Sequence, residues 1–456
     1  MKRRVKHIYF IGIGGIGMSG IAEVLLNLGY TISGSDVGRS DITERLASMG
    51  ANIYYGHDPA NLGKVDVVVT STAIMADNPE VIEAQERNIP VIPRAEMLAE
   101  LLKMKVSVAV SGTHGKTTTT SMISTVMAHG GLDPTMVIGG KLASIGSNAR
   151  LGGGDVIVAE ADESDKSFLK LSPYIAVITN IELEHLDHFS GIDEIKEAFV
   201  EFANLVPFYG VTILCGDDEN VKEILPRIKR RFITYGLSEG VDYQATDISF
   251  QGSGSRFSLW YKKNFLGFIS LNVPGIYNVC NSVAAIAVAR ELEMDFAAIT
   301  DGIGSFSGVQ RRLEVKGDVR GMTVVDDYGH HPTEIMATLK AARQVWAGRR
   351  LVVVFQPHRY TRTKGLFNEF LGAFGDADVL VVTDIYAASE QPIEGVTAEN
   401  LARGIADRGH RNVTYLPAFD DIVAHLMDIT KPGDVVMTVG AGTVWKVGEQ
   451  FIKTNG

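Results

Sequence analysis

A glycine-rich loop near the start of the chain has the spacing of a phosphate-binding turn. Residues Gly12 to Gly17 match the pattern G-x-G-x-x-G between a predicted strand and a predicted helix. Glycine permits the tight turn, and backbone N–H groups at the positive end of the helix can approach a diphosphate. Asp36 follows about 20 residues later, where dinucleotide sites carry an acidic ligand for ribose. The pattern favours NAD without separating it from a nucleotide-sugar diphosphate, and a turn that merely needs glycine is the other alternative.

A second loop has the spacing of a P-loop for nucleoside triphosphates. The segment Gly112-Thr113-His114-Gly115-Lys116-Thr117-Thr118 joins a predicted strand to a predicted helix. Backbone amides of such a loop cradle phosphates, Lys116 can reach the terminal ones, and the Thr117 hydroxyl can bind Mg²⁺. The general pattern has another glycine at the position of Val110, but the strand–loop–helix context still predicts an ATP site.

Ligands for Mg²⁺ are expected near this second loop, because a magnesium ion bound with ATP prefers carboxylate oxygens. Glu160 ends a predicted strand that can neighbour the loop, and it is therefore the first candidate. The acidic run that follows, Asp162-Glu163-Ser164-Asp165, fits an exposed, solvated loop as well as a functional one. His185 is a candidate ligand of a second metal ion, although a single histidine is more often structural.

Parallel sheets are needed to position these loops, and the sequence predicts them throughout its length. Short runs rich in Val and Ile alternate with helical patterns from end to end, which is typical of parallel α/β structure. The chain has 456 residues, and about 150 residues per domain gives three domains. We expect an α/β fold with a Rossmann-like N-terminal domain (1–104), a central P-loop-type ATPase domain with an added antiparallel hairpin (105–310), and a Rossmann-like C-terminal domain (311–456).

The predicted elements are short and regularly spaced. In the first domain the strands are Val5–Ile11, Tyr30–Ser35, Asn52–Tyr54, Val65–Thr70 and Val91–Ile92, with helices such as Met18–Leu28 and Pro79–Arg87. In the second they are Ser107–Ser111, Val156–Ala159 and Ile175–Thr179, followed by a hairpin around Lys263-Asn264 and a helix Asn278–Leu292. In the third they are Met322–Asp326, Leu351–Phe355, Val379–Thr383 and Val435–Val439, with helices such as Thr333–Arg343 and Phe367–Phe374.

The composition excludes several classes of protein. Hydrophobic residues make up 45% and charged residues 21%, which is the balance of a globular chain. A net charge of −11 argues against a broad nucleic-acid surface. Cys215 and Cys280 cannot form a disulfide framework, and no apolar run reaches the roughly 18 residues that cross a bilayer. We therefore expect a cytoplasmic protein with no nucleic-acid and no membrane partner.

Several motifs together resemble the Mur ligase family, ATP-dependent enzymes that form amide bonds in peptidoglycan precursors. Besides the second glycine loop, the motifs are Glu160 to Asp165, Thr179-Asn180-Ile181-Glu182 with His185, Asp326 to Pro332, and Gln356 to Arg362. The resemblance covers essentially the whole chain, and the combination of motifs is far more specific than any one of them.

Within the family the chain is most similar to the branch that joins L-alanine to UDP-N-acetylmuramate. The features of that branch are Gly12 to Gly17 followed by Met18-Ser19-Gly20, and the run His358-Arg359-Tyr360-Thr361-Arg362. The alternative within the family is the recycling ligase that adds a murein tripeptide to the same nucleotide sugar and lacks the second run.

The resemblance implies a role for each domain, and it implies that the first loop binds a UDP diphosphate rather than NAD. The nucleotide sugar would be held by Gly14, Gly15, Ile16, Gly17, Asp36, Ser71, Thr72 and Arg94. ATP would be held by Gly112, Thr113, His114, Gly115, Lys116, Thr117, Thr118, Asn278 and Arg312. Two Mg²⁺ ions would be held by Thr117, Glu160 and His185.

The third domain would bring the amino acid, through Tyr328, His330, Arg359 and Arg362. ATP phosphorylates the carboxylate of the sugar, and the amine then displaces phosphate, so negative charge crowds near Lys116 and Arg359. His330 is either the base that takes the proton of the amine or a positioning hydrogen bond. Arg359 and Arg362 share a face if their segment is helical, and could then bind the carboxylate of alanine.

Two other classes of function remain open at this point. A nicotinamide oxidoreductase would use the first glycine loop with Asp36 but not the second loop, and a non-catalytic nucleotide-binding regulator would need no amino-acid pocket. Under the ligase interpretation the partners are three small molecules, UDP-N-acetylmuramate, L-alanine and ATP, and the chain is a monomer or a weak homodimer.

Overall fold

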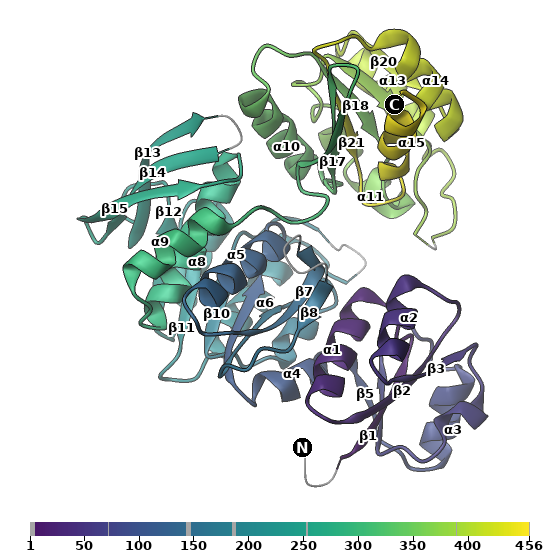
Figure 1. Cartoon of the computed structure of the whole chain (residues 1–456), viewed down its shortest axis with the longest axis vertical. Helices are drawn as coiled ribbons and strands as arrows, with labels where there is room; N and C mark the ends of the chain where they lie inside the picture. Colours follow the sequence, from purple (N-terminus) through teal and green to yellow (C-terminus); the bar gives the residue numbers. More distant parts are fainter. Residues whose placement is uncertain are drawn as a thin grey trace. The chain divides into compact units, whose positions relative to one another are not determined.

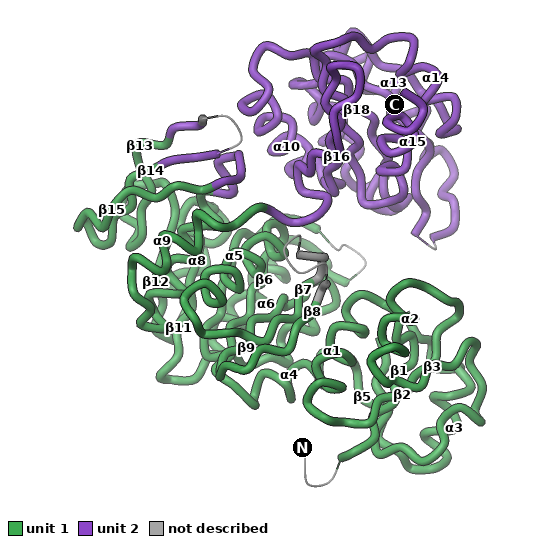
Figure 2. The backbone as a smooth tube through the Cα atoms, viewed as in Figure 1, with its two compact units in different colours: residues 1–248, 257–271, 279–307 green, residues 249–256, 272–278, 308–456 purple. Residues whose placement is uncertain are grey.

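The computed structural model (Figure 1) describes residues 5–71, 73–142, 147–184, 188–251, 254–388 and 390–455. The chain divides into two compact units (Figure 2). Unit 1 comprises Met1–Ile248, Phe257–Leu271 and Val279–Ser307, and unit 2 comprises Ser249–Arg256, Asn272–Asn278 and Gly308–Gly456.

A five-stranded parallel sheet begins the chain, in the order β3-β2-β1-β4-β5. Its strands are β1 (His7–Ile11), β2 (Thr31–Asp36), β3 (Asn52–Tyr55), β4 (Val67–Thr70) and β5 (Val91–Pro93). Its helices are α1 (Ile16–Asn27), α2 (Asp41–Ser48), η1 (Pro59–Leu62), α3 (Pro79–Glu86) and α4 (Arg94–Leu102). The strands predicted here are confirmed within two residues at each end. Because the strand order reverses at β1, the loop after β1 lies where open α/β sheets bind nucleotides.

A ten-stranded sheet follows, in the order β15-β14-β13-β12-β11-β10-β6-β9-β7-β8. Its strands are β6 (Val106–Ser111), β7 (Thr135–Leu142), β8 (Ser147–Arg150), β9 (Val156–Glu160), β10 (Ile175–Ile178), β11 (Val211–Cys215), β12 (Phe232–Gly236), β13 (Tyr243–Gln251), β14 (Gly254–Tyr261) and β15 (Asn264–Leu271). Its helices are α5 (Lys116–His129), η2 (Ser167–Lys170), α6 (Ile192–Asn204), α7 (Glu219–Ile224), η3 (Leu225–Arg227), α8 (Ile276–Glu291) and α9 (Phe296–Ser305). Since β6 lies between β9 and β10 with parallel pairing, the carboxyl ends of these three strands meet at one edge.

The predicted hairpin is confirmed at the far end of this sheet. β14 and β15 are joined by Lys262 and Lys263, whose φ angles of 47° and 66° are those of a two-residue turn between antiparallel strands. The sequence did not indicate the other antiparallel pair, β7 with β8.

A six-stranded sheet lies in unit 2, in the order β16-β17-β21-β18-β19-β20. Its strands are β16 (Glu314–Val319), β17 (Met322–Asp327), β18 (Leu351–Phe355), β19 (Val379–Val382), β20 (Val413–Tyr415) and β21 (Val435–Val439), parallel except for β16 with β17. Its helices are α10 (Pro332–Val345), α11 (Tyr360–Gly365), α12 (Phe367–Phe370), α13 (Ala398–Asp407), α14 (Phe419–Ile429) and α15 (Trp445–Asn455). The single helix predicted over Phe367–Phe374 is wrong in extent, because α12 ends at Phe370.

The cores of unit 2 show why the central strands are apolar along their whole length. Val353 and Phe355 of β18 face one apolar cluster, and Val352 and Val354 face another. Alternate residues of a strand point to opposite faces of the sheet, so a strand covered by helices on both faces must be apolar at every position.

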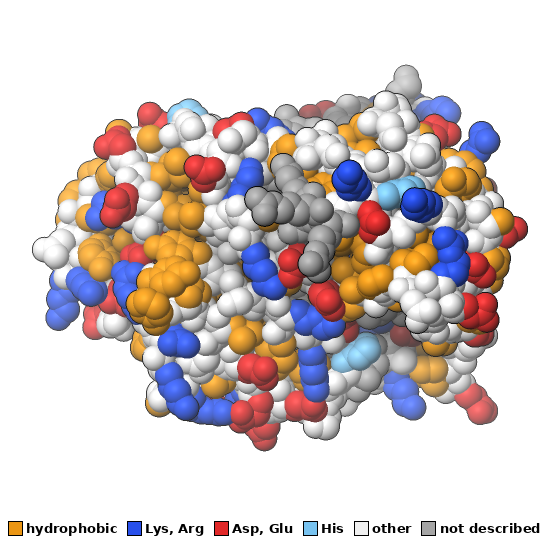
Figure 3. Space-filling view, turned by 90° about the horizontal axis from the view of Figure 1, so that it is seen from below, with side chains coloured by type: hydrophobic (Ala, Val, Ile, Leu, Met, Phe, Trp, Pro, Cys, Tyr) orange, Lys and Arg blue, Asp and Glu red, His pale blue; other side chains and the backbone are white. Residues whose placement is uncertain are grey.

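The surface carries charges of both signs. On the face drawn in Figure 3, basic and acidic side chains are interspersed. Within the described part of the chain, every helix is too short or too polar to span a lipid bilayer.

Candidate functional site

Lys116, the first residue of α5, lies at the centre of the second glycine loop. Its ammonium donates to the carbonyl oxygens of Gly112 at 2.6 Å and Thr113 at 3.1 Å, and to Oε1 of the buried Glu163 at 2.8 Å. Burial works against the charged form, but the carboxylates of Glu163 and Asp162 outweigh it and raise the pKa of Lys116. The lysine therefore carries a positive charge where a P-loop holds phosphate.

The backbone of the loop is held by residues that follow β10. Thr113 N–H donates to the carbonyl of Asn180 at 3.1 Å, and His114 N–H donates to Oδ1 of Asn180 at 2.8 Å. The Thr179 hydroxyl donates to the carbonyl of His114 at 2.6 Å. Gly112 has a φ of 132°, and a Cβ there would overlap the Thr179 side chain, so this position requires glycine. The loop is thus shaped before any ligand arrives.

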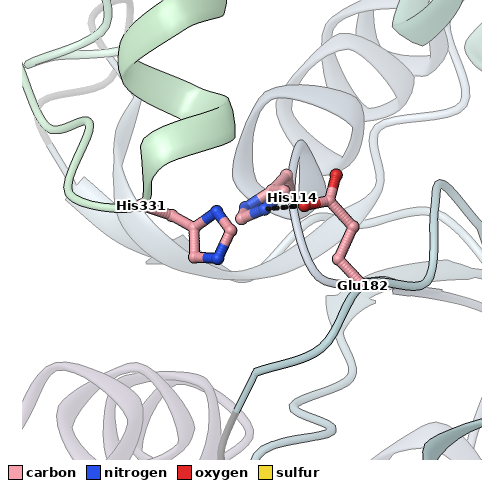
Figure 4. A group of neighbouring side chains, drawn as sticks. All are labelled: His114, Glu182 and His331. Atoms are coloured by element: carbon pink, nitrogen blue, oxygen red, sulfur yellow. Dashed lines mark ion pairs between the residues drawn. The ribbon is translucent and has the colours of Figure 1, made fainter. Parts of the chain in front are cut away.

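His114 and Glu182 form an ion pair beside the loop, with 3.4 Å between Nε2 and Oε2 (Figure 4). The backbone N–H of Glu182 also donates to the hydroxyl of Thr113 at 2.8 Å. His331, the third side chain drawn in Figure 4, belongs to unit 2, where it caps α10 by accepting from the N–H of Thr333 at 3.3 Å. The sequence places Asn180 and Glu182 in a motif but predicts no individual role for them. In the structure, both residues contact the loop.

The candidate metal ligands are partly brought together. Glu160 ends β9 in register with Val110, directly before the loop, and it acts electrostatically on Lys116. Thr117 lies in the first turn of α5. A carboxylate and a hydroxyl beside a phosphate loop are oxygen ligands that suit Mg²⁺. His185 lies outside the described residues.

Helix α8 supplies an asparagine to the loop that the sequence did not single out. A Cβ on Gly115, whose φ is 81°, would lie 3.1 Å from Oδ1 of the buried Asn281. Asn278, one of the predicted ATP contacts, uses its amide to donate to the carbonyl of Pro274 at 2.6 Å. Asn281 lies three residues after Asn278 on the same helix. This spacing puts the two side chains on one face and could have indicated Asn281 from the sequence.

The first glycine loop, which follows β1, is held by the end of the neighbouring strand β2. Ser35 accepts at its carbonyl from the N–H groups of Gly12 at 2.8 Å and Ile13 at 3.0 Å. Asp36 accepts at Oδ2 from the N–H of Gly14 at 2.8 Å. Asp36 therefore orders the loop in the free protein, a contact that its expected role as a ribose ligand did not include.

The other predicted contacts of the nucleotide sugar lie around this loop. Gly15 precedes α1 as its N-cap, Ile16 is exposed, and Gly17 lies in the first helical turn. Ser71 directly follows β4, and Thr72 lies outside the described residues. Arg94 begins α4, and a Cβ on Gly17 would lie 2.8 Å from its Nη1.

In unit 2, aromatic and cationic residues follow β17. The guanidinium of Arg312 lies 5.5 Å from the ring centroid of Tyr328 and 3.5 Å from the carboxylate of Glu334. The ring of His330 packs edge-on against Tyr328, and its Nδ1 lies 3.1 Å from the carbonyl of Tyr328. Because a carbonyl only accepts, and Oε2 of Glu334 also lies 3.4 Å from Nδ1, this nitrogen carries a proton.

The segment after β18 becomes helical only at Tyr360. Arg359 has a φ of 67° and precedes α11, and its N–H donates to the carbonyl of Tyr386 at 2.9 Å. Arg362 lies within α11, and its Nη1 donates to Nδ1 of His358 at 2.9 Å. The condition under which both arginines would share a helical face is not met, because the helix begins only at Tyr360.

Buried aspartates fix the loop that carries Tyr328 and His330. Asp327 accepts from the N–H groups of Leu313 and Gly329, both at 2.8 Å, and burial raises its pKa. Arg311 donates through Nε to Asp326 at 2.8 Å, and its guanidinium lies 4.9 Å from the ring centroid of Tyr328. Arg311 was missed in the sequence, where its neighbour Arg312 was chosen.

Models of known protein families match successive parts of the chain. The three models are "Mur ligase family, catalytic domain" at residues 7–106, "Mur ligase middle domain" at 110–289, and "Mur ligase, glutamate ligase domain" at 311–442. UDP-N-acetylmuramate–L-alanine ligase of Syntrophus aciditrophicus is 66% identical over 452 residues, which cover 99% of this chain and 94% of that protein. The enzyme of the same name from Geobacter sulfurreducens is 59% identical, over 99% of this chain and 98% of that protein.

Solved structures agree in fold over the whole chain. The UDP-N-acetylmuramate–alanine ligase of Thermotoga maritima has a TM-score of 0.82 at 28% identity, covering 99% of both chains. A murein peptide ligase of Psychrobacter arcticus has a TM-score of 0.71 at 26% identity, also covering 99% of both chains.

Proposed function

Since the chain belongs to the Mur ligase family, we propose that it joins L-alanine to the lactyl carboxylate of UDP-N-acetylmuramate at the expense of ATP. One observation carries this proposal: the 66% identity that extends over 99% of the chain to a ligase of that name. The product is a precursor of peptidoglycan, so the enzyme acts in cell-wall synthesis.

The phosphate loop supports the first half of the reaction. A carboxylate oxygen of the sugar attacks the γ-phosphorus of ATP, the bond to ADP breaks, and an acyl phosphate forms. Lys116, whose ammonium lies over the loop carbonyls, neutralises the charge on the transferred phosphoryl group. Mg²⁺, when bound, supplies further positive charge, and Thr117, Glu160 and His185 would hold the two expected ions.

Unit 2 supports the second half. The nitrogen of alanine attacks the acyl carbon, the bond to phosphate breaks, and the amine loses a proton. His330, whose Nδ1 faces the carbonyl of Tyr328, would accept that proton or position the amine, and Arg359 and Arg362 would bind the carboxylate of alanine. Asn278 and Arg312 would contact ATP.

The proposal assigns one task to each domain. Residues 1–104 hold the nucleotide sugar, through Gly14 to Gly17, Asp36, Ser71, Thr72 and Arg94. Residues 105–310 hold ATP, and residues 311–456 bring the amino acid. The enzyme works in the cytoplasm, where its three small-molecule substrates occur, as a monomer or a weak homodimer.

Release of ADP by the purified chain tests this function. We expect release only when UDP-N-acetylmuramate and L-alanine are both present with ATP and Mg²⁺. Release that does not require the nucleotide sugar would contradict the proposal, and so would reduction of NAD in its place.

The acceptor separates the two ligases that share these motifs. The murein tripeptide, offered at the same concentration as L-alanine, should give little product, because the ligases at 59–66% identity are named for L-alanine. A preference for the tripeptide would assign the chain to peptide recycling instead.

A further inference from the structure

Arg94 occupies a position that disfavours a cation. Its guanidinium lies against Gly17 in the first turn of α1, close enough that a Cβ on Gly17 would be 2.8 Å from Nη1. The N-terminal end of a helix carries a positive partial charge, so a guanidinium there needs a negative group nearby. The carboxylate of Asp162 meets that need, with 3.6 Å between its Oδ2 and Nη2 of Arg94.

The position of Asp162 is fixed by the turn that follows β9. Its Oδ1 accepts from the N–H of Ser164 at 3.1 Å, and its carbonyl accepts from the N–H of Phe168 at 3.1 Å and from the hydroxyl of Ser167 at 3.2 Å. Helix α4 packs against η2, and Leu98 and Phe168 belong to one apolar cluster. The spacing between the carboxylate and the guanidinium is therefore set by packed elements.

Glu163, the residue after Asp162, contacts Lys116, the cation of the phosphate loop. Glu163 accepts from Lys116 at 2.8 Å, whereas Asp162 faces Arg94. Two adjacent carboxylates on one turn thus serve two cations, one at the phosphate loop and one at the first glycine loop. Asp162 also acts electrostatically on Lys116, but its ion pair is with Arg94, so its loss should affect the ligand of Arg94 more than the ligand of Lys116.

We propose that Asp162 is a positioning residue for the nucleotide sugar, which holds the guanidinium of Arg94 beside the first glycine loop. The inference rests on the proposed function, in which Arg94 binds UDP-N-acetylmuramate. A turn of the ten-stranded sheet therefore completes a site that the five-stranded sheet begins.

Calorimetric titration of the full chain tests this role. Asp162→Asn keeps the size of the side chain and an acceptor for Ser164 but removes the charge. We expect its Kd for UDP-N-acetylmuramate to rise about three- to fivefold, because a partly exposed ion pair contributes little. Its Kd for ADP with Mg²⁺ should change less than its Kd for the nucleotide sugar, because Asp162 acts on Lys116 only electrostatically, and its Tm should not change.

Asp165→Asn is the matched control, because it removes the same charge from the same turn. Asp165 accepts from the N–H of Ser167 at 2.9 Å, a bond that asparagine can keep. Its Kd for the nucleotide sugar should equal that of the wild type. An equal rise in both variants would show a general charge effect and overturn the proposal.

A double-variant cycle with Arg94→Ala separates positioning from a structural role. Asp162→Asn should add no loss of affinity once Arg94 is absent, and Asp162→Glu should recover part of the affinity when it is present. Unchanged or tighter binding by Asp162→Asn, or the same loss in both backgrounds, would overturn the proposal. So would an unchanged Kd for Arg94→Ala.

Steady-state rates give a readout that a folding defect would not reproduce. Asp162→Asn should raise KM for the nucleotide sugar several-fold and leave kcat unchanged. If the wild type binds ADP but not UDP-N-acetylmuramate, the proposed function fails and this inference fails with it. If the wild type binds both and Asp162→Asn matches it, only this inference fails.

Discussion

The ammonium of Lys116 donates to three acceptors in the free protein, and replacing the residue removes all three hydrogen bonds. Lys116→Met removes the ammonium that lies 2.8 Å from the buried carboxylate of Glu163. We expect turnover to fall at least 10²–10³-fold, the usual cost of losing one group that stabilises transition-state charge. The Kd for UDP-N-acetylmuramate should stay within about twofold, and the assays are ADP release and calorimetric titration.

The double variant Lys116→Met/Glu163→Gln controls for folding. An uncompensated buried carboxylate costs about 1–3 kcal/mol in the free energy of unfolding, and removing both charges should recover most of it. Turnover should stay low in the double variant, because the phosphate ligand is still missing. Recovery of turnover together with stability would show that Lys116 has only a structural role.

The raised pKa of Lys116 gives a pH dependence whose sign can be worked out. A basic group with a higher pKa in the folded state stabilises the fold fully below its unfolded pKa, which is about 10.4, and loses this effect as the pH rises through the folded value. The difference in unfolding free energy between the wild type and Lys116→Met should therefore persist from pH 7 to pH 9 and shrink above about pH 10. Urea unfolding at these pH values measures it. Loss of the difference by pH 9 would contradict the raised pKa.

At the scale of elements, a buried carboxylate holds the five-stranded sheet together. Glu80 on α3 accepts from the hydroxyl of Tyr9 on β1 at 2.7 Å, from the hydroxyl of Ser35 on β2 at 2.5 Å, and from the amide of Asn61 on η1 at 2.9 Å. Nδ1 of His57 lies 3.2 Å from the same carboxylate. These side chains come from β1, β2 and the segment 57–61, so the carboxylate fixes the spacing of these three parts of the chain.

Glu80→Gln should destabilise the protein by about 2–3 kcal/mol, because an NH₂ group then faces donors and loses charge-assisted bonds. Denaturant unfolding measures this loss. Glu86→Gln, on the exposed side of the same helix, is the matched control and should change stability by less than about 0.5 kcal/mol. Equal stability of the two variants would contradict the role given to Glu80.

How far the elements and the site could be predicted depended on whether the deciding interaction is local. The strands and both glycine loops were predicted, because apolar runs and glycine spacing reflect local geometry. The position of Arg359 just outside its helix could not be predicted, because its left-handed φ is accompanied by a hydrogen bond to Tyr386, which is distant in sequence. Glu163 could not be told from a solvated acidic residue, because its burial against Lys116 is a tertiary contact. The resemblance to the family was carried by motifs and is confirmed by the comparisons.

At the scale of the whole molecule, the two units have separate apolar cores. The large cluster of unit 1 includes Phe168 and Phe199, and the clusters of unit 2 include Phe355 and Phe451. Cores that share no residues can unfold separately, so differential scanning calorimetry should resolve two transitions.

A ligand of the phosphate loop assigns these transitions. ADP with Mg²⁺ at about 100 times its Kd stabilises the folded state that binds it by about 2.7 kcal/mol, and it should raise the transition of unit 1 more than that of unit 2. Lys116→Met should abolish most of this shift. A single transition that moves as one would show that both units unfold together.

The three hydrogen bonds of the Lys116 ammonium in the free protein also limit the affinity of any anion that binds in that loop. Since each of its three N–H groups already has an oxygen partner, an incoming anion gains affinity only from what it adds beyond replacing them. Free orthophosphate adds little, whereas a nucleotide also engages the backbone amides and the base pocket. The phosphate released in the reaction should therefore dissociate readily from the loop, and free orthophosphate in the cell should compete poorly with the nucleotide.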